Sequence, residues 1–270
     1  MDETEHIARR VCENHLQEQI RYDREHNILP SEIAVAERML ANGSALERFY
    51  KEIYPALNHD GITWKNALHC ALYVGTFWTA EDIAERRAGR KELKELNEDI
   101  SRQASALADL LDRRTTLYEH SGFGAETHYA IYEVIDAAAA HNGHYQGWVR
   151  EPLLALRRFD LKYWPTLSEC IRVIGQDAYQ AEIAANTSLT EAATHSLRPS
   201  KADSVRALLA SIEDHRGDWV GGIPNSFEFS NAVLADLVNV LFELPAEGLV
   251  SDEYMKIQRH RAKGGARRPA

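Results

Sequence analysis

A run of residues between 93 and 117 repeats at alternating intervals of three and four, and this spacing constrains the fold more than any other feature of the chain. An apolar repeat of this kind is typical of a helix that packs knobs into holes against another helix. Gln103 and Arg114 interrupt it with polar groups, which fix register or partner at a cost in stability. The eight positions, here called the heptad seam, are Leu93, Leu96, Ile100, Gln103, Leu107, Leu110, Arg114 and Leu117.

Two arrangements could cover the heptad seam. It runs for under four heptads, which is short for a free-standing dimer, so an antiparallel hairpin within the chain is the favoured interpretation. The alternative is a seam between two copies, in which Gln103 would contact the partner. Ile100 and Leu107 are expected to be buried in either case.

The rest of the chain also favours helices, and strand patterns are nearly absent. Capping residues and Gly or Pro stops predict an all-α fold, a multi-helix bundle around one long helix from Thr79 to about Glu119. The polar stretch from Asn186 to Ser200 is the best linker candidate. We therefore expect a main bundle over residues 1–190, a small C-terminal helical unit over 200–258 and a basic flexible tail over 259–270. The further helices are expected over 3–26, 30–41, 44–55, 63–78, 125–141, 145–158, 166–185, 200–216 and 231–243, with a last one from Ser251.

Charge is divided unevenly along the chain. The net charge is −10, but the last fifteen residues hold six basic side chains and no acidic ones. Residues 1–255 therefore carry −16, from 25 basic and 41 acidic residues. Such a body repels phosphate backbones, so nucleic-acid binding by the body is disfavoured, whereas the basic tail could contact a nucleic acid or an acidic partner.

The cysteines and the first residues indicate the compartment. Cys12, Cys70 and Cys170 lie far apart, with no C-x-x-C pair, which fits a reducing cytosol. The first six residues are acidic where a secretory signal would be basic and then apolar. The longest apolar stretch, from Ala67 to Trp78, is too short to cross a bilayer. We expect a soluble cytoplasmic protein that does not enter the membrane.

Sequence motifs for common catalytic sites and cofactors are missing. There is no phosphate-binding glycine loop, no G-x-S-x-G elbow and no H-E-x-x-H zinc motif. His141 and His144 are three residues apart, but Gly143 breaks the helix between them, so a shared face is not assured. We expect neither a metal site nor a cofactor.

A Gly- and Pro-containing loop carries the best candidates for a partner contact. Residues 218–229 hold Trp219, Phe227 and Phe229 between two predicted helices. Aromatic side chains in such a loop either fill the core or anchor a partner. We expect at least one of the three to be substantially exposed.

Two short patterns resemble helical nucleic-acid and nucleotide enzymes. An Arg followed by a His at a short interval resembles the signature of HEPN-type ribonucleases, and the best-placed pair is Arg21 and His26. The resemblance implies that the imidazole activates a ribose 2′-hydroxyl while the guanidinium stabilises phosphorane charge, without a metal. His59-Asp60 resembles the paired ligands of HD-type phosphohydrolases, although Pro55 and Gly61 predict a turn here.

The leading functional hypothesis is an interaction protein with a regulatory or accessory role. No complete catalytic constellation is present, and the heptad seam and the aromatic loop both suit a protein partner or a homodimer. The alternative hypothesis is a metal-independent all-α ribonuclease of the HEPN kind.

Overall fold

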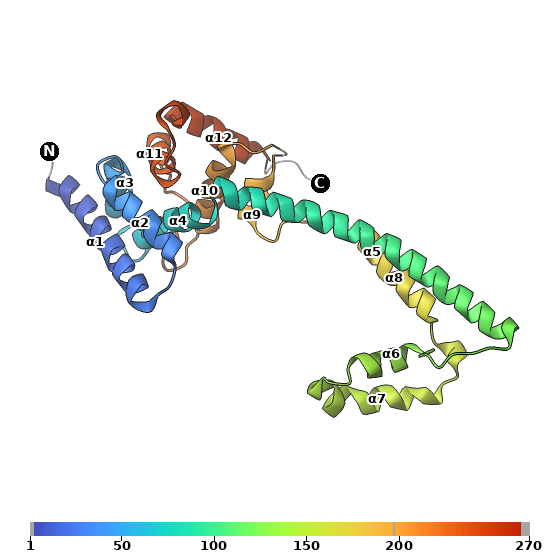
Figure 1. Ribbon diagram of the computed structural model, residues 1–270. Helices are drawn as coiled ribbons and strands as arrows, with labels where there is room; N and C mark the ends of the chain where they lie inside the picture. The colour runs from blue at the N-terminus through green and yellow to red at the C-terminus, as the bar shows by residue number, and fades with distance from the viewer. Residues whose placement is uncertain (1–2, 197, 266–270) are drawn as a thin grey trace. The chain divides into compact units, whose positions relative to one another are not determined.

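The computed structural model describes residues 3–196 and 198–265, and its regular structure is α-helical apart from short 3₁₀ and π turns (Figure 1). The described residues contain no strand, only one isolated β-bridge between Arg216 and Ile223. The long predicted helix is α5, Ala80–Ser121. The all-α prediction is therefore confirmed.

Packing divides the chain into two compact units. The first combines residues 1–88 with 184–270, and the second is residues 89–183. The division falls at 88/89 and 183/184 and not at the linker expected between 186 and 200. That stretch contains a helix, α9 (Ser188–Thr194), whose Leu189 and Ala193 are buried in the core of the first unit.

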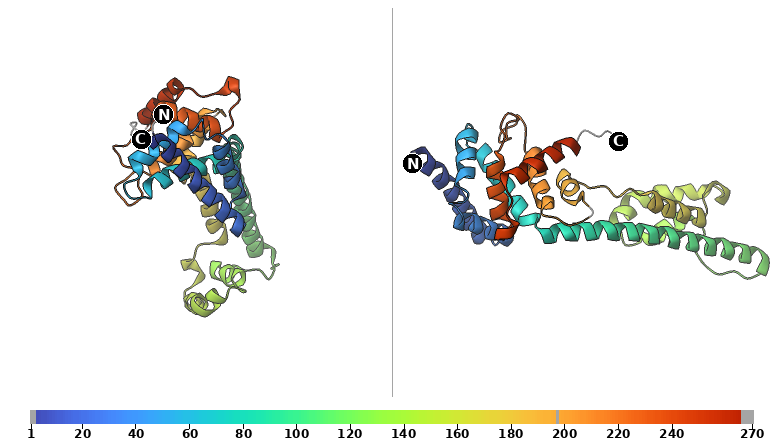
Figure 2. Two further views of the ribbon diagram at one scale, coloured as in Figure 1. Left: turned by 90° about the vertical axis from the view of Figure 1, so that its left-hand side faces the viewer. Right: turned by 90° about the horizontal axis from the view of Figure 1, so that it is seen from above.

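The first unit has a continuous apolar core, to which segments from both ends of the chain contribute. Buried side chains of the N-terminal helices, such as Phe49 and Leu72, share this core with Leu208 and Leu234. Its helices, visible in Figures 1 and 2, are α1 (Glu3–His26), α2 (Pro30–Ala41), α3 (Glu47–Leu57), α4 (Thr63–Phe77), the first residues of α5, α9, α10 (Ala202–Asp214), α11 (Asn231–Leu241) and α12 (Asp252–Gly265).

Some helix starts follow the capping signals of the sequence, whereas α3 and α4 begin without a side-chain bond from their N-cap residues. The Asp82 carboxylate accepts from Thr79 N and the Asp82 amide donates back to Thr79 Oγ1, which closes the box that starts α5. The Ser230 hydroxyl accepts from the Val233 amide at the start of α11. Pro55 was expected to stop α3, but it lies inside the last turn of that helix.

The C-terminal segment is more ordered than expected. Helix α12 continues to Gly265, so residues 259–265 of the predicted flexible tail are helical, and residues 266–270 lie outside the described part. Arg259 donates to the backbone oxygen of Phe229 and to Asn231, which ties α12 to the start of α11. Arg259, which was assigned to the flexible tail, therefore makes contacts that hold the fold together.

The second unit has few buried apolar residues. In the described structure they are Ala104, Ala108, Ala130, Tyr132 and Tyr145, together with the polar or small Ser168 and Gly175. Its helices are the remainder of α5, then α6 (Ile131–Ala138), α7 (Arg150–Ala155) and α8 (Leu167–Gln180). Many of its large apolar side chains are consequently exposed.

Candidate functional site: the apolar face of the α5–α8 helix pair

Helix α8 packs antiparallel on α5 within the second unit (Figure 1). Near its middle, Arg172 donates to the carboxylates of Asp109 (3.1 Å) and Asp112 (2.6 Å). Three residues later in α8, Gly175 meets Ala104, which lies five residues before Asp109 in α5. Hydrogen bonds from Ser168 and from Arg172, in that order of effect, hold the pKa of the Asp112 carboxyl below its ordinary value.

The surface that α8 covers is a stripe of small residues. Ser101, Ala104 and Ala108 lie on this stripe, and a Cβ built on Gly175 would be only 2.8 Å from the Ala104 Cβ. Small residues on both helices therefore let the two backbones approach closely, and this stripe lies about a quarter turn from the heptad seam.

The heptad seam itself is not covered. Its six aliphatic side chains are 43–63% exposed, and Gln103 is exposed as well. The interpretation of the seam as the contact of an intramolecular hairpin is therefore wrong, and so is the expected burial of Ile100 and Leu107 within the chain. The hairpin exists, but it uses the neighbouring stripe of small residues.

Helix α8 extends this apolar surface with the exposed Ile174 and the partly buried Leu167 and Ile171. Leu167, Ile171 and Ile174 recur at intervals of four and three, on one flank of the α8 surface that meets α5. Because residue numbers turn in opposite senses on two antiparallel helices, this flank and the heptad seam point to the same side of the pair. We define the apolar face as the aliphatic residues of the heptad seam together with Leu167, Ile171 and Ile174.

Two polar residues of the heptad seam interrupt this face. Gln103 has no hydrogen-bond partner among the described side chains. The buried Nε of Arg114 also lacks a partner, while its guanidinium lies 5.9 Å from the centre of the Tyr118 ring. Polar groups at these positions can select one register of a partner helix.

The Trp219 loop is the second exposed apolar feature, and it belongs to the first unit. Gly217 N donates to Ile223 O (3.1 Å) and Ile223 N donates to His215 O (2.8 Å), which closes the loop. The indole of Trp219 lies over Gly217 and Gly222, where an added Cβ would be 2.7 and 3.1 Å from the ring. The glycines therefore make room for the ring, and Trp219 stays 52% exposed as expected.

Asp60 fixes this loop to the start of α4. Its carboxylate accepts hydrogen bonds from the amides of Ile62, Thr63 and Gly221 and from the Thr63 hydroxyl. These bonds hold the pKa of the Asp60 carboxyl well below its ordinary value. His59 and Asp60 lie in a turn, as predicted, and the four hydrogen bonds give the carboxylate a structural role.

The other two aromatic candidates of the loop belong to the core. Phe229 is 3% exposed and stacks on Phe49 at a centroid distance of 6.2 Å. Phe227 is half-buried and meets the Phe229 ring edge-on at 4.9 Å. Phe229 is therefore not available to a partner, which corrects its assignment as a contact residue.

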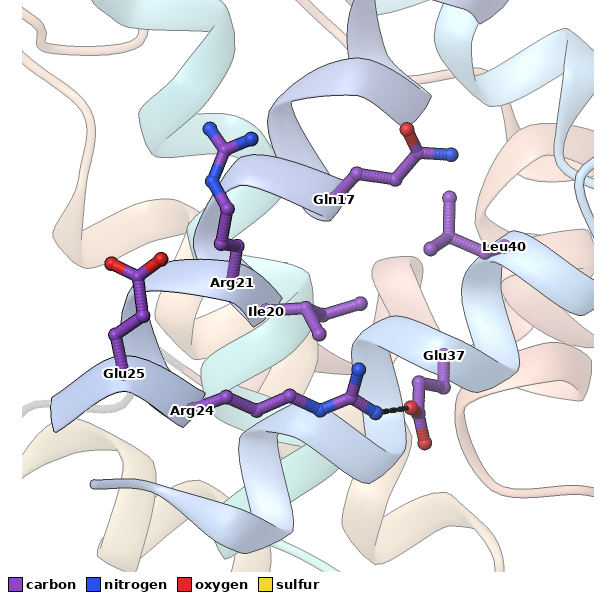
Figure 3. A pocket seen from close by; sticks show the side chains of 7 residues that line it. All are labelled: Gln17, Ile20, Arg21, Arg24, Glu25, Glu37 and Leu40. Atoms are coloured by element: carbon purple, nitrogen blue, oxygen red, sulfur yellow. Dashed lines mark hydrogen bonds and ion pairs between the residues drawn. The ribbon is translucent and has the colours of Figure 1, made fainter. Parts of the chain in front are cut away.

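The ribonuclease pair is not assembled in the structure. Arg21 lies on the rim of a shallow pocket of about 420 Å³ between α1 and α2, where Arg24 pairs with Glu37 (Figure 3). His26 instead stacks on Tyr22 at 4.1 Å, and its Nδ1 lies 2.8 Å from the Tyr22 carbonyl oxygen. Across the described residues, no hydrogen bond joins Arg21 to His26.

A histidine pair that no sequence motif predicts joins α1 to α4. The Nε2 atoms of His15 and His69 are 3.3 Å apart, and burial lowers the pKa of His15 to about 4. Their separation of 54 positions leaves no local sequence signal. Within residues 3–196 and 198–265, no group of three or more His, Cys, Asp or Glu side chains could hold a metal ion, and His141 and His144 are both exposed.

None of the described helices is long and apolar enough to cross a membrane. Comparison of the chain with protein-family models, with curated proteins and with solved structures finds no match.

Proposed function

We propose that this protein acts by binding other protein chains, with the apolar face of the α5–α8 pair as the contact surface. The observation that carries the proposal is the exposure of all six aliphatic residues of the heptad seam. Contiguous apolar surface of this kind marks interaction sites in proteins, whereas single exposed apolar residues are ordinary.

The pattern of residues supports a helical partner. Knob positions spaced by three and four residues suit insertion between the side chains of another helix. Leu167, Ile171 and Ile174 widen the face on the same side, so the partner would meet two helices at once. The second unit buries few apolar side chains, so the residues of the apolar face do not form its core.

The Trp219 loop supports a second contact. Its backbone is closed by hydrogen bonds and anchored by Asp60, so an aromatic side chain held there loses little entropy when it docks. Trp219 and Val220 are both exposed at the tip. We assign this loop an accessory role, since two side chains bury less surface than the apolar face.

The test is proximity labelling of the intact chain in cells, with wild type, Leu96→Glu/Leu110→Glu and Ser105→Glu as baits. Both leucines and Ser105 are exposed, so none of these changes removes a core contact. We expect the double variant to lose a defined set of labelled proteins, among them an untagged copy of this chain, that wild type and Ser105→Glu keep. Identical labelling by all three baits, at equal abundance and helix content, would overturn the proposal.

A further inference from the structure

We infer that the occupant of the apolar face is a second copy of this chain, whose α5 runs antiparallel to the first and is centred on Ser105. The inference rests on the proposed function, since both use the same face. It adds the identity of the partner, the direction of its helix and the register.

The heptad seam is symmetric about Ser105. Each member has a counterpart at the same distance on the other side of this residue. In an antiparallel pair of helices, an a residue packs opposite a d residue, and that is the relation between the counterparts. The four pairs are Leu93 with Leu117, Leu96 with Arg114, Ile100 with Leu110, and Gln103 with Leu107.

Other registers pair the seam less well. A shift by one heptad in one direction places Leu117 opposite Arg86 and Arg114 opposite Gly89. The opposite shift takes Leu93 beyond the end of α5 at Ser121. Only the register centred on Ser105 gives each seam residue a partner from the seam.

Charges beside the seam favour the antiparallel direction. The g positions are Glu92, Asp99, Ala106 and Arg113. In an antiparallel pair the g positions of the two helices flank the same side. Arg113 of one copy therefore lies beside Glu92 of the other and beside Asp99, which also pairs with Arg102 of its own helix (2.7 Å). The neighbouring Arg114, whose buried Nε has no hydrogen-bond partner among the described residues, approaches the same carboxylates. A parallel pair would instead place Arg114 against Arg114.

The position of α8 favours the same direction. Antiparallel pairing brings both copies of α8 to one side of the two long helices, because the flanks they occupy face each other. Leu167, Ile171 and Ile174 of each copy then close over the seam, which makes a four-helix arrangement. Parallel pairing would put the two α8 helices on opposite sides and leave these residues in water.

The mass of the intact chain tests the association. By light scattering, we expect twice the 30.6 kDa of one chain for the wild type and for Ser105→Glu. Leu107→Glu should weaken association by roughly 100-fold or more, because it buries a charge at the centre of the interface. Its helix content by circular dichroism should stay unchanged, since Leu107 is exposed in the single chain.

A cysteine pair tests the direction and register. In a Cys170→Ser background, which leaves only the buried Cys12 and Cys70, Ala106→Cys places its thiol beside the symmetry axis. Ala106→Cys should therefore form a covalent dimer with a short bismaleimide, whereas Ser105→Cys, on the outer face, should not. The inference would be overturned if Ser105→Cys formed the covalent dimer efficiently and Ala106→Cys did not. It would also be overturned if the wild type stayed monomeric at every concentration. A monomeric wild type whose labelled partners still disappear in Leu96→Glu/Leu110→Glu would leave the proposed function standing.

Discussion

Gly175 on α8 lies against Ala104 on α5 so closely that an added Cβ would be 2.8 Å from the alanine methyl group and 3.3 Å from the carbonyl oxygen of Ser101. This contact decides which surface of α5 is covered. A helix that approaches through glycine and alanine buries the stripe of small residues and leaves the larger leucines of the heptad seam outside.

Replacing this glycine should separate the pair. Gly175→Leu forces its side chain into Ala104 and backbone, and overpacking of this kind costs about 1–3 kcal/mol. We expect faster hydrogen exchange across α8, measured by mass spectrometry. Val173→Leu is the matched control, because Val173 is exposed and its enlargement fills no buried contact. Equal exchange in the two variants would contradict the packing described here.

Phe229 and Trp219 lie in the same loop, but their replacement by alanine should change the stability of the fold to different extents. Phe229→Ala removes a buried ring stacked on Phe49 and should destabilise the fold by about 3–5 kcal/mol. Trp219→Ala should leave the free energy of unfolding nearly unchanged, because its ring is half exposed. Urea denaturation measures both values. A large loss in the tryptophan variant would show that its indole is part of the core.

Acid should weaken the anchor of this loop. The pKa of the Asp60 carboxyl is lower in the folded than in the unfolded chain, so its contribution to stability is full above about pH 5 and is lost as the pH falls through about 4 and below. Asp60→Asn cannot titrate, and its melting temperature should fall less steeply over that range than that of wild type. Parallel slopes for the two proteins would mean that the carboxylate is not held by these hydrogen bonds.

The ribonuclease hypothesis predicts that the purified protein cleaves RNA, whereas the binding proposal predicts that it leaves RNA intact. Because His26 is engaged with Tyr22 and no bond links it to Arg21, we expect purified protein to leave single-stranded RNA intact with and without divalent metal. The measurement is gel analysis of a labelled RNA after incubation. Cleavage that is abolished by Arg21→Ala and by His26→Ala, in variants that keep their helix content, would restore the ribonuclease hypothesis.

The long helix and most of the other helices could be predicted from the sequence, because caps such as Thr79/Asp82 and Thr166/Glu169 are local signals. The surface covered by α8 could not be predicted from the leucine spacing. A helix can carry two adjacent stripes of period 3–4, and the spacing alone does not say which is covered within the chain. Ser101, Ala104 and Ala108 were the available signal, since small residues on one stripe permit a close approach.

Other errors have similar physical causes. The polar residues 186–200 predicted a linker, but Leu189 and Ala193 are enough to dock a short helix on α10. Pro55 sits in the last turn of α3, where Tyr54 and Leu57 still pack on the core. The pair of His15 and His69 depends on the packing of α1 against α4, which no local pattern encodes.

The pairing of two copies through the apolar face can be tested by carbene footprinting of the intact chain at low and at high protein concentration, with labels read residue by residue. We expect Leu107 and Leu110 to be labelled strongly in the dilute protein and to be protected in the concentrated one, while Trp219 is labelled equally in both. In the Leu107→Glu variant, Leu110 should stay labelled at both concentrations. Equal and strong labelling of the heptad seam at every concentration in wild type would contradict the conclusion that a second copy covers this face.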